Sequence, residues 1–197
     1  MNNRPGKQLL LNFPSHPEYD FSNFVVSEGS RIAFETAKEF CSENPAPYQA
    51  LYIFGQKNLG KTHLLLSIGN RVAERELRAV CIQGHDFVDK LGGDPSPEAQ
   101  QTLKQLLNVD FFLMDNVESL TNSPTAQEKL YHIYNQMMEK GGKLAFTANL
   151  PPDRNSAMES YLTSRFQWGM VAEIKPIDDF TTAKIILKLA KDINLTI

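Results

Sequence analysis

Apolar residues follow two different spacings along this chain. Short continuous apolar runs have the length of buried β-strands. These runs lie at 50–54, 79–83, 109–115, 143–148 and 170–175. They predict five strands, the first of which is A-L-Y-I-F and ends at Gly55.

Between these runs the apolar residues recur at helical spacing, which predicts amphipathic helices. Ser30 is the expected N-cap of the first helix, and Pro124 lies in the first turn of a later one. Strands that alternate with helices predict a parallel sheet covered on both faces, which is an α/β fold. The helical segments are 29–42, 61–76, 124–139 and 179–193, with short helical pieces beside the loop at 92–97.

Composition narrows the classes of protein that this chain can represent. With 197 residues, it can form one good-sized domain and the start of a second. A net charge of −3 argues against a domain that grips duplex DNA by charge alone. Cys41 and Cys81 lack metal-ligand spacing and are expected to be reduced, buried thiols. No membrane span or signal peptide is apparent, so we expect a cytoplasmic protein.

The stretch after the first strand matches the phosphate-binding pattern G-x-x-x-x-G-K-[ST] in full. A predicted strand precedes it and a predicted helix follows, which is the context that the pattern requires. The two glycines let successive N–H groups point at phosphate oxygens, while Lys61 reaches the β/γ-phosphates and the Thr62 hydroxyl binds Mg²⁺. The residues are Gly55, Gln56, Lys57, Asn58, Leu59, Gly60, Lys61 and Thr62.

Two further strands end in residues that suit a Mg²⁺–nucleotide site. Asp115 follows F-F-L-M and is the expected metal-binding acid, since ligands bind at the carboxyl ends of parallel strands. Asp110 begins the same strand and is expected to be structural. The fourth strand ends in T-A-N, which places Thr147 or Asn149 near the γ-phosphate, where an amide could orient water. A plain strand-end turn is the alternative for Asn149.

Several motifs together resemble the AAA+ core of the bacterial DnaA family. They are G-K-T-H-L-L, M-D-N-V-E, F-T-A-N-L-P-P and L-T-S-R-F-Q-W-G-M. The resemblance implies an AAA+ core over 19–176 that binds ATP or ADP with Mg²⁺. It also implies that Phe24, Val25 and Val26 contact the adenine. His63 follows the phosphate loop and belongs to the expected nucleotide site, although its position alone favours packing over catalysis.

Within this family, M-D-N-V-E is most similar to the shorter Hda-like regulators. DnaA proteins carry two acids where this chain has Asp115 and Asn116. The resemblance implies a regulator that stimulates hydrolysis of ATP bound to DnaA and has weak turnover of its own. Contact with DNA is expected to be indirect or weak, and self-association into a homo-oligomer stays open. Residues 177–197 correspond to the first helix of the family's lid, which would be truncated in this chain.

Two segments would connect such a regulator to its partners. Arg165, in T-S-R-F-Q-W-G, matches the arginine finger that acts on a neighbour's nucleotide; a structural ion pair at a helix end is the alternative. Residues 1–18 are expected to form an extended tail whose peptide resembles those that dock on the polymerase sliding clamp. An N-terminal strand, or a hydrophobic clip onto the domain itself, is the alternative. The peptide's docking residues are Gln8, Leu9, Leu11 and Phe13.

Two other functions fit the same residues. The chain could be a DnaA-like or helicase-loader-like ATPase that hydrolyses its own ATP, with Glu118 polarising water in place of an acid at Asn116. It could also be an adaptor in which nucleotide is structural. The chain's own ATP turnover distinguishes the ATPase from a regulator. An Arg165→Ala variant distinguishes the adaptor from a regulator, because only a regulator would lose stimulated hydrolysis on its partner.

Overall fold

A computed structural model describes residues 10–13, 18–44 and 46–192. At its centre is a six-stranded sheet in the order β1-β3-β4-β5-β2-β6. All neighbouring strands are parallel except β1, which runs antiparallel to β3. The predicted α/β fold with five parallel strands is therefore confirmed. The parallel strands are β2 (Ala50–Gly55), β3 (Ala79–Gln83), β4 (Phe111–Asp115), β5 (Lys143–Ala148) and β6 (Met170–Ile174).

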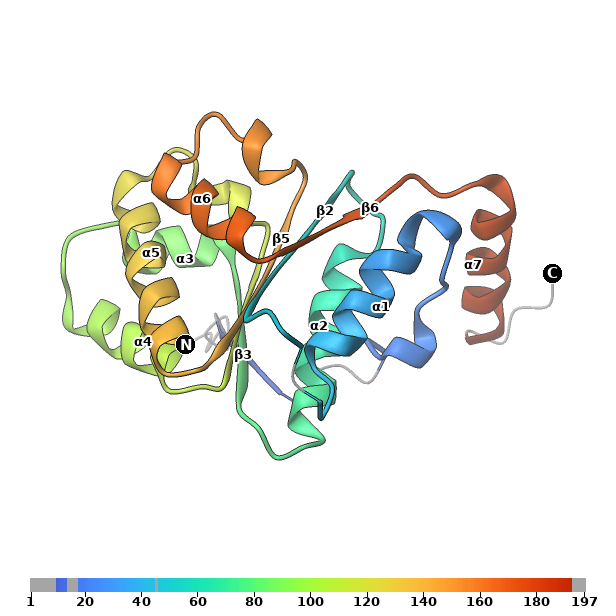
Figure 1. The fold of residues 1–197 in the computed structure, drawn as a ribbon, viewed down its shortest axis with the longest axis horizontal. Coiled ribbons are helices and arrows are strands. Elements are labelled where there is room, and N and C mark those ends of the chain that lie inside the picture. The colour runs from blue at the N-terminus through green and yellow to red at the C-terminus, as the bar shows by residue number, and fades with distance from the viewer. Residues whose placement is uncertain (1–9, 14–17, 45, 193–197) are drawn as a thin grey trace, which may run out of the picture.

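Helices cover both faces of the sheet. In Figure 1 the sheet is seen nearly edge-on, with α1 and α2 on one side and α3 to α6 on the other, while α7 stands beyond α1. The helices are α1 (Arg31–Phe40), α2 (Lys61–Ala73), α3 (Gly84–Leu91), α4 (Pro97–Leu107), α5 (Pro124–Glu139), α6 (Ser160–Trp168) and α7 (Asp179–Asp192). Four short 3₁₀ turns lie at Phe21–Asn23, Glu28–Ser30, Val117–Leu120 and Pro152–Arg154.

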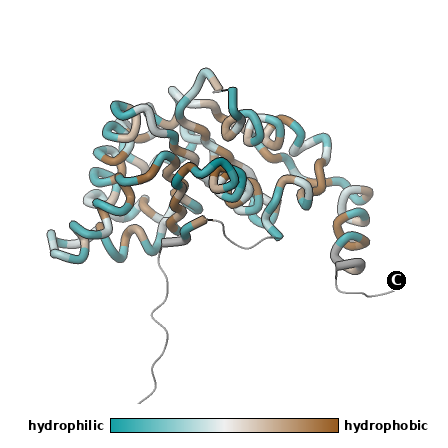
Figure 2. The backbone as a smooth tube through the Cα atoms, turned by 90° about the horizontal axis from the view of Figure 1, so that it is seen from below, coloured by the Kyte–Doolittle hydropathy of each residue, from teal (hydrophilic) through white to brown (hydrophobic). Residues whose placement is uncertain are grey.

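The core forms two apolar layers because successive strand residues point to opposite faces. On β2, Leu51 and Ile53 pack towards α1 and α2, whereas Tyr52 packs towards α5 and α6. Figure 2 shows the complementary pattern in the helices, whose turns alternate between hydrophobic and hydrophilic colours. Cys41 and Cys81 are buried and free, as expected. None of the described helices has the length and apolar content needed to cross a membrane.

The entry into α1 differs from the sequence prediction. Ser30 precedes the helix but makes no side-chain cap to it. Instead, Ser27 and Ser30 form a reciprocal capping box around the 3₁₀ turn before the helix, with Ser27 Oγ accepting from Ser30 N at 3.1 Å and Ser30 Oγ from Ser27 N at 2.9 Å. The capped start of this region is therefore Ser27, one turn before the N-cap that the sequence predicts at Ser30.

The N-terminal segment joins the sheet. β1 (Leu10–Asn12) pairs with β3, with Leu11 opposite Cys81, so part of the predicted tail is an edge strand. The next residue, Phe13, lies over Gly69 of α2 so closely that a Cβ on Gly69 would be 2.2 Å from its ring. This arrangement corresponds to the alternative of an N-terminal strand, and it covers backbone groups that β3 would otherwise leave unpaired.

Because Phe13 and Gly69 are in close contact, the effect of substituting Gly69 should depend on whether Phe13 is present. Alanine in place of glycine within a helix stabilises by about 1 kcal/mol when the site is free. We expect Gly69→Ala to stabilise a Phe13→Ala protein, but to stabilise the wild type less or destabilise it, because the new methyl group displaces the Phe13 ring.

The measurement is the free energy of unfolding in urea for the four proteins of the cycle, with coupling of about 0.5–3 kcal/mol expected. Equal effects of Gly69→Ala in both backgrounds would show that Phe13 does not occupy this position.

Candidate functional site

The phosphate loop lies between the end of β2 and the start of α2. Asn58 and Gly60 have positive φ values of 64° and 90°, which turns the loop so that α2 begins at Lys61. A hollow of about 680 Å³ opens beside it. The amino end of α2 faces this space and supplies unpaired N–H groups and a partial positive charge. Its lining includes Lys57, Asn58, Gly60, Lys61, Thr62, His63, Asn116, Glu118 and Asn149.

Lys61 is held over the loop by three oxygens. Its Nζ donates to the carbonyls of Gly55 at 2.8 Å and Gln56 at 2.7 Å, and to Asn149 Oδ1 at 3.3 Å. Burial lowers the pKa of Lys61, while the carboxylates of Glu118 and Asp115 oppose that shift. An ammonium group poised in this way is suited to phosphate oxygens, and Asn149 is placed beside it as the sequence predicts.

Asp115 joins three elements at the carboxyl end of the sheet. Its carboxylate accepts from the Thr62 hydroxyl at 2.8 Å and from Gln83 Nε2 at 2.9 Å, and also from the Thr147 hydroxyl. Only 2% of the residue is exposed. Sequence reasoning missed Gln83, because nothing in the local pattern around the end of β3 indicates a contact with β4.

The residues present fit a magnesium ion bound together with nucleotide. Thr62 Oγ1 and Asp115 Oδ2 lie 2.8 Å apart, and both are the hard oxygen ligands that Mg²⁺ prefers. The described residues contain no cluster of three or more His, Cys, Asp or Glu that could hold a metal by itself. Mg²⁺ is commonly held by one or two protein oxygens, waters and substrate phosphates, and Thr62 and Asp115 could supply the protein oxygens.

Asn116 occupies the position that follows the metal-binding acid. It has a left-handed backbone with φ 58°, its N–H donates to Thr147 Oγ1 at 2.9 Å, and its amide donates to Gln83 Oε1 at 3.1 Å. Its side chain is thus engaged with the end of β3. The Asn116 amide supports Gln83, which is itself bound to the carboxylate expected to bind metal, but an amide cannot act as a general base.

Glu118 brings a second carboxylate to the hollow. Asn149 Nδ2 donates to its Oε1, while its Oε2 is buried with no hydrogen-bond partner among the described residues. Burial raises the pKa of Glu118, and the Lys61 ammonium counteracts this in part. The carboxylate that could polarise water therefore lies three residues beyond Asp115 and is connected through Asn149 to Lys61.

A second hollow of about 430 Å³ adjoins the loop. Phe24 and Val25 line it together with Leu59 of the phosphate loop, and α7 closes it with Ile185 and Lys188. It has the size and mainly apolar lining suited to a nucleobase. Val26 is not among its lining residues and is 39% exposed.

His63 lines both hollows and links them. Its Nε2 lies 2.9 Å from the Asp20 carbonyl, and its ring meets those of Tyr19 and Phe24 edge-on at 5.4 Å. Burial lowers the pKa of His63, to which the charge of Lys188 also contributes. These contacts give His63 a packing role between the two hollows.

Arg165 lies away from these hollows. It lines a separate space of about 580 Å³ with Ala50, which begins β2, whereas the phosphate loop begins where β2 ends at Gly55. Five strand residues at about 3.3 Å each separate the two ends by about 16 Å. Arg165 makes no ion pair within the described part of the chain, so the structural ion pair considered as its alternative is absent there.

Of the predicted clamp-docking peptide, Gln8 and Leu9 lie outside the described residues. Leu11 belongs to β1, and Phe13 packs on α2. Docking elsewhere would require Leu11 to leave the sheet and Phe13 to leave α2, so clamp binding stays a prediction.

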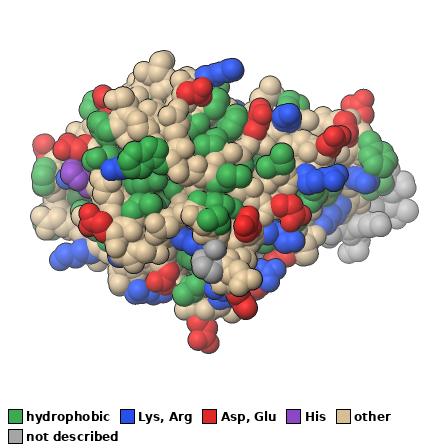
Figure 3. All heavy atoms as spheres, viewed as in Figure 1, with side chains coloured by type: hydrophobic (Ala, Val, Ile, Leu, Met, Phe, Trp, Pro, Cys, Tyr) green, Lys and Arg blue, Asp and Glu red, His purple; other side chains and the backbone are tan. Residues whose placement is uncertain are grey.

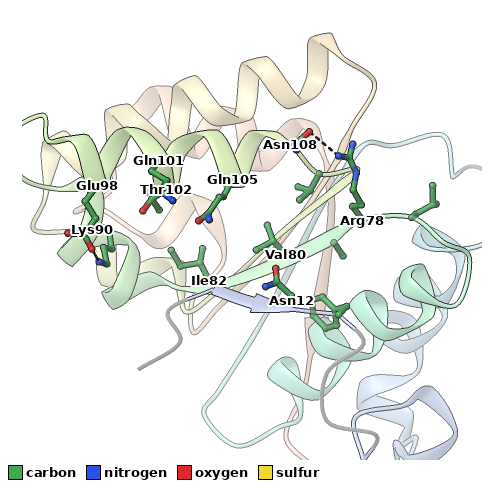
Figure 4. A pocket seen from close by; sticks show the side chains of 14 residues that line it. Asn12, Arg78, Val80, Ile82, Lys90, Glu98, Gln101, Thr102, Gln105 and Asn108 are labelled. Carbon is green, nitrogen blue, oxygen red and sulfur yellow. Dashed lines mark hydrogen bonds and ion pairs between the residues drawn. The ribbon is translucent and has the colours of Figure 1, made fainter. Parts of the chain in front are cut away.

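A further hollow of about 670 Å³ lies between α4 and the β1–β3 edge (Figure 4). Its two cations are already engaged, since Arg78 donates to Asn108 at 2.9 Å and Lys90 pairs with Glu98. Figure 3 likewise shows both charges interspersed over one face of the molecule. These features do not favour binding of a nucleic-acid phosphate backbone in this hollow. Weak contact with DNA stays a prediction.

A phosphate loop after β2, an acid at the tip of β4 and an amide after β5 define a P-loop nucleotide-binding protein of the AAA+ class. The sequence profile of the bacterial DnaA ATPase domain matches residues 15–173. The chain belongs to this family.

Individual relatives agree with this assignment. The chromosomal replication initiator DnaA of Thermotoga petrophila is 34% identical over 189 residues, which are 93% of this chain and 42% of the relative. Domain III of Thermotoga maritima DnaA superimposes with a TM-score of 0.83 at 33% identity, covering 93% of this chain and 78% of that one. AMPPCP-bound DnaA from Aquifex aeolicus superimposes with a TM-score of 0.81 at 29% identity, covering 92% of this chain and 57% of that one.

The chain thus spans less than half the length of the Thermotoga petrophila relative. These relatives are replication initiators, so they support membership of the DnaA family, while the closer resemblance to Hda-like regulators stays a prediction.

The metal site predicts a charge-specific effect on nucleotide binding. Asp115→Asn preserves shape but removes the charge that faces Mg²⁺. We expect the affinity for ATP with Mg²⁺ to fall at least ~10-fold, the scale on which even outer-shell metal partners matter. Titration calorimetry with and without EDTA measures it.

Asp110→Asn is the matched control, because Asp110 lies at the other end of β4 and accepts from the Arg78 N–H. An Asp115→Asn protein that keeps full Mg²⁺-dependent affinity would contradict this metal assignment.

The buried imidazole predicts a pH effect on stability. His63 has a pKa below its ordinary 6.5, so the unfolded chain takes up the proton first as pH falls. The wild type should therefore lose stability below about pH 6.5. His63→Gln should show a flatter dependence in urea unfolding between pH 7.5 and 5.5. An unchanged slope would show that His63 titrates normally.

Proposed function

We propose that this chain binds ATP or ADP with Mg²⁺ and acts as an AAA+ subunit in DnaA-type assemblies of bacterial replication initiation. Arg165 would complete the site of a neighbouring subunit. The observation that carries this proposal is the separation of Arg165 from its own phosphate loop by the length of β2. An arginine that cannot reach its own nucleotide can reach that of a neighbour, where such a finger contributes ~10³–10⁵ in rate.

Two more specific functions are compatible with this proposal, and they differ in which subunit hydrolyses ATP. In the first, the chain is DnaA-like and turns over its own nucleotide. The relatives reported above favour this one, and the Glu118–Asn149 pair beside Lys61 provides a carboxylate that could polarise water.

In the second, the chain is an Hda-like regulator that promotes hydrolysis on DnaA while it is docked on the sliding clamp. Asn116 favours this function, because the acid of DnaA proteins is replaced by an amide that binds Gln83. The placement of Phe13 on α2 weighs against a freely available docking peptide.

The test of the proposal is hydrolysis of labelled ATP preloaded on DnaA. We expect the wild-type chain to accelerate it and Arg165→Ala to remove the acceleration. Arg154→Ala, at the exposed end of the 3₁₀ turn Pro152–Arg154, is the matched control and should act like the wild type. Equal acceleration by wild type and Arg165→Ala would refute the finger assignment.

Turnover of ATP by the chain alone separates the two finer functions. The DnaA-like function predicts measurable turnover that Glu118→Gln abolishes while ATP affinity persists. The Hda-like function predicts negligible turnover in both proteins and acceleration on DnaA that requires the clamp.

A further inference from the structure

Arg165 is held by aromatic rings on two helices. It lies in the last turn of α6, and its Cζ is 4.6 Å from the ring centroid of Trp168 and 5.5 Å from that of Tyr131 on α5. Both distances lie within the range of cation–π contacts. The Arg165 carbonyl also accepts from the Tyr134 hydroxyl at 3.0 Å, so the backbone is fixed to α5 as well.

Among the described residues, no carboxylate pairs with the guanidinium, and the Tyr131 hydroxyl is the polar group that lies beside it. Arginine stacks on aromatic rings through the face of its planar group, whereas its N–H donors lie in the plane. Arg165 Nε is buried and has no hydrogen-bond partner among the described residues. A carboxylate partner would have used the same donors that a phosphate needs, and aromatic rings avoid that competition.

The rings also lie where a neighbouring molecule can reach. Trp168 is 76% exposed, and it borders the hollow that Arg165 lines. Tyr131 is partly exposed, and the Asn135 amide and the Arg165 guanidinium beside its hydroxyl lower the pKa of Tyr131. A side chain that is ordered before contact loses less conformational entropy when it binds.

We propose that Tyr131 and Trp168 are positioning residues for the Arg165 finger. They hold the guanidinium in place through cation–π contacts, with no carboxylate on its donors, before a neighbouring subunit presents its nucleotide. This inference rests on the proposed function, because it assigns a role within hydrolysis on a neighbour. The contacts between Arg165 and the two rings can also be tested in the isolated chain.

Fluorescence tests the stacking in the chain alone. Trp168 is the single tryptophan of the sequence, so all tryptophan emission comes from beside Arg165. Arg165→Met removes the cation but keeps an apolar side chain of similar length, and should change emission intensity or wavelength. Arg154→Met, at an exposed position, should leave the spectrum unchanged. Identical spectra for wild type and Arg165→Met would overturn the stacked arrangement.

Kinetics tests the positioning role with DnaA that carries labelled ATP. We expect Trp168→Ala and Tyr131→Leu to lower the maximal stimulated rate about 10- to 100-fold, the scale of a misplaced catalytic group. The concentration for half-maximal stimulation should change much less. Trp168→Phe and Tyr131→Phe keep an aromatic face and should restore most of the rate, while thermal melting confirms that each variant folds.

The outcomes separate this inference from the function on which it rests. If wild type stimulates, Arg165→Ala does not, and both ring variants stimulate fully, the positioning role is wrong and the finger stands. A change in half-maximal concentration alone would make the rings binding anchors and overturn the positioning role. If wild type fails to stimulate, the proposed function and this inference fall together.

Discussion

The hydrogen bonds to the Asp115 carboxylate are the constraint on which the site depends. They join the first turn of α2, through Thr62, to the ends of β3 and β5, through Gln83 and Thr147. Three donors pair both oxygens of this buried carboxylate, and carboxylate oxygens are ligands that Mg²⁺ prefers. Because Thr147 also accepts from the Asn116 backbone, the same bonds set the turn that carries Glu118 into the hollow.

The parallel sheet divides the chemistry between two places on the molecule. Its carboxyl end gathers the phosphate loop, Asp115 and Asn149, as expected for ligand sites in open α/β folds. Arg165 lies by the opposite end of β2. The group that would neutralise transition-state charge thus faces away from the nucleotide that the same chain would hold, which makes assembly with a neighbour the natural way to complete a site.

Much of this arrangement could be predicted from local patterns. The five parallel strands, the phosphate loop and Asp115 each depend on a few consecutive residues, and they lie where the sequence places them. Contacts between distant segments could not be foreseen in the same way. Three of these contacts depend on which strands and helices become neighbours. They are the pairing of β1 with β3, the hydrogen bond from Gln83 to Asp115 and the cation–π contact between Arg165 and Tyr131.

In the proposed function, Arg165 of this chain completes a nucleotide site on another subunit. Its most direct test uses a DnaA partner that is loaded with ATP and has its own finger arginine replaced by alanine, so that it hydrolyses slowly by itself. We expect the wild-type chain to restore hydrolysis on this partner and Arg165→Ala to leave it slow. Restoration by both proteins, or by neither, would contradict it.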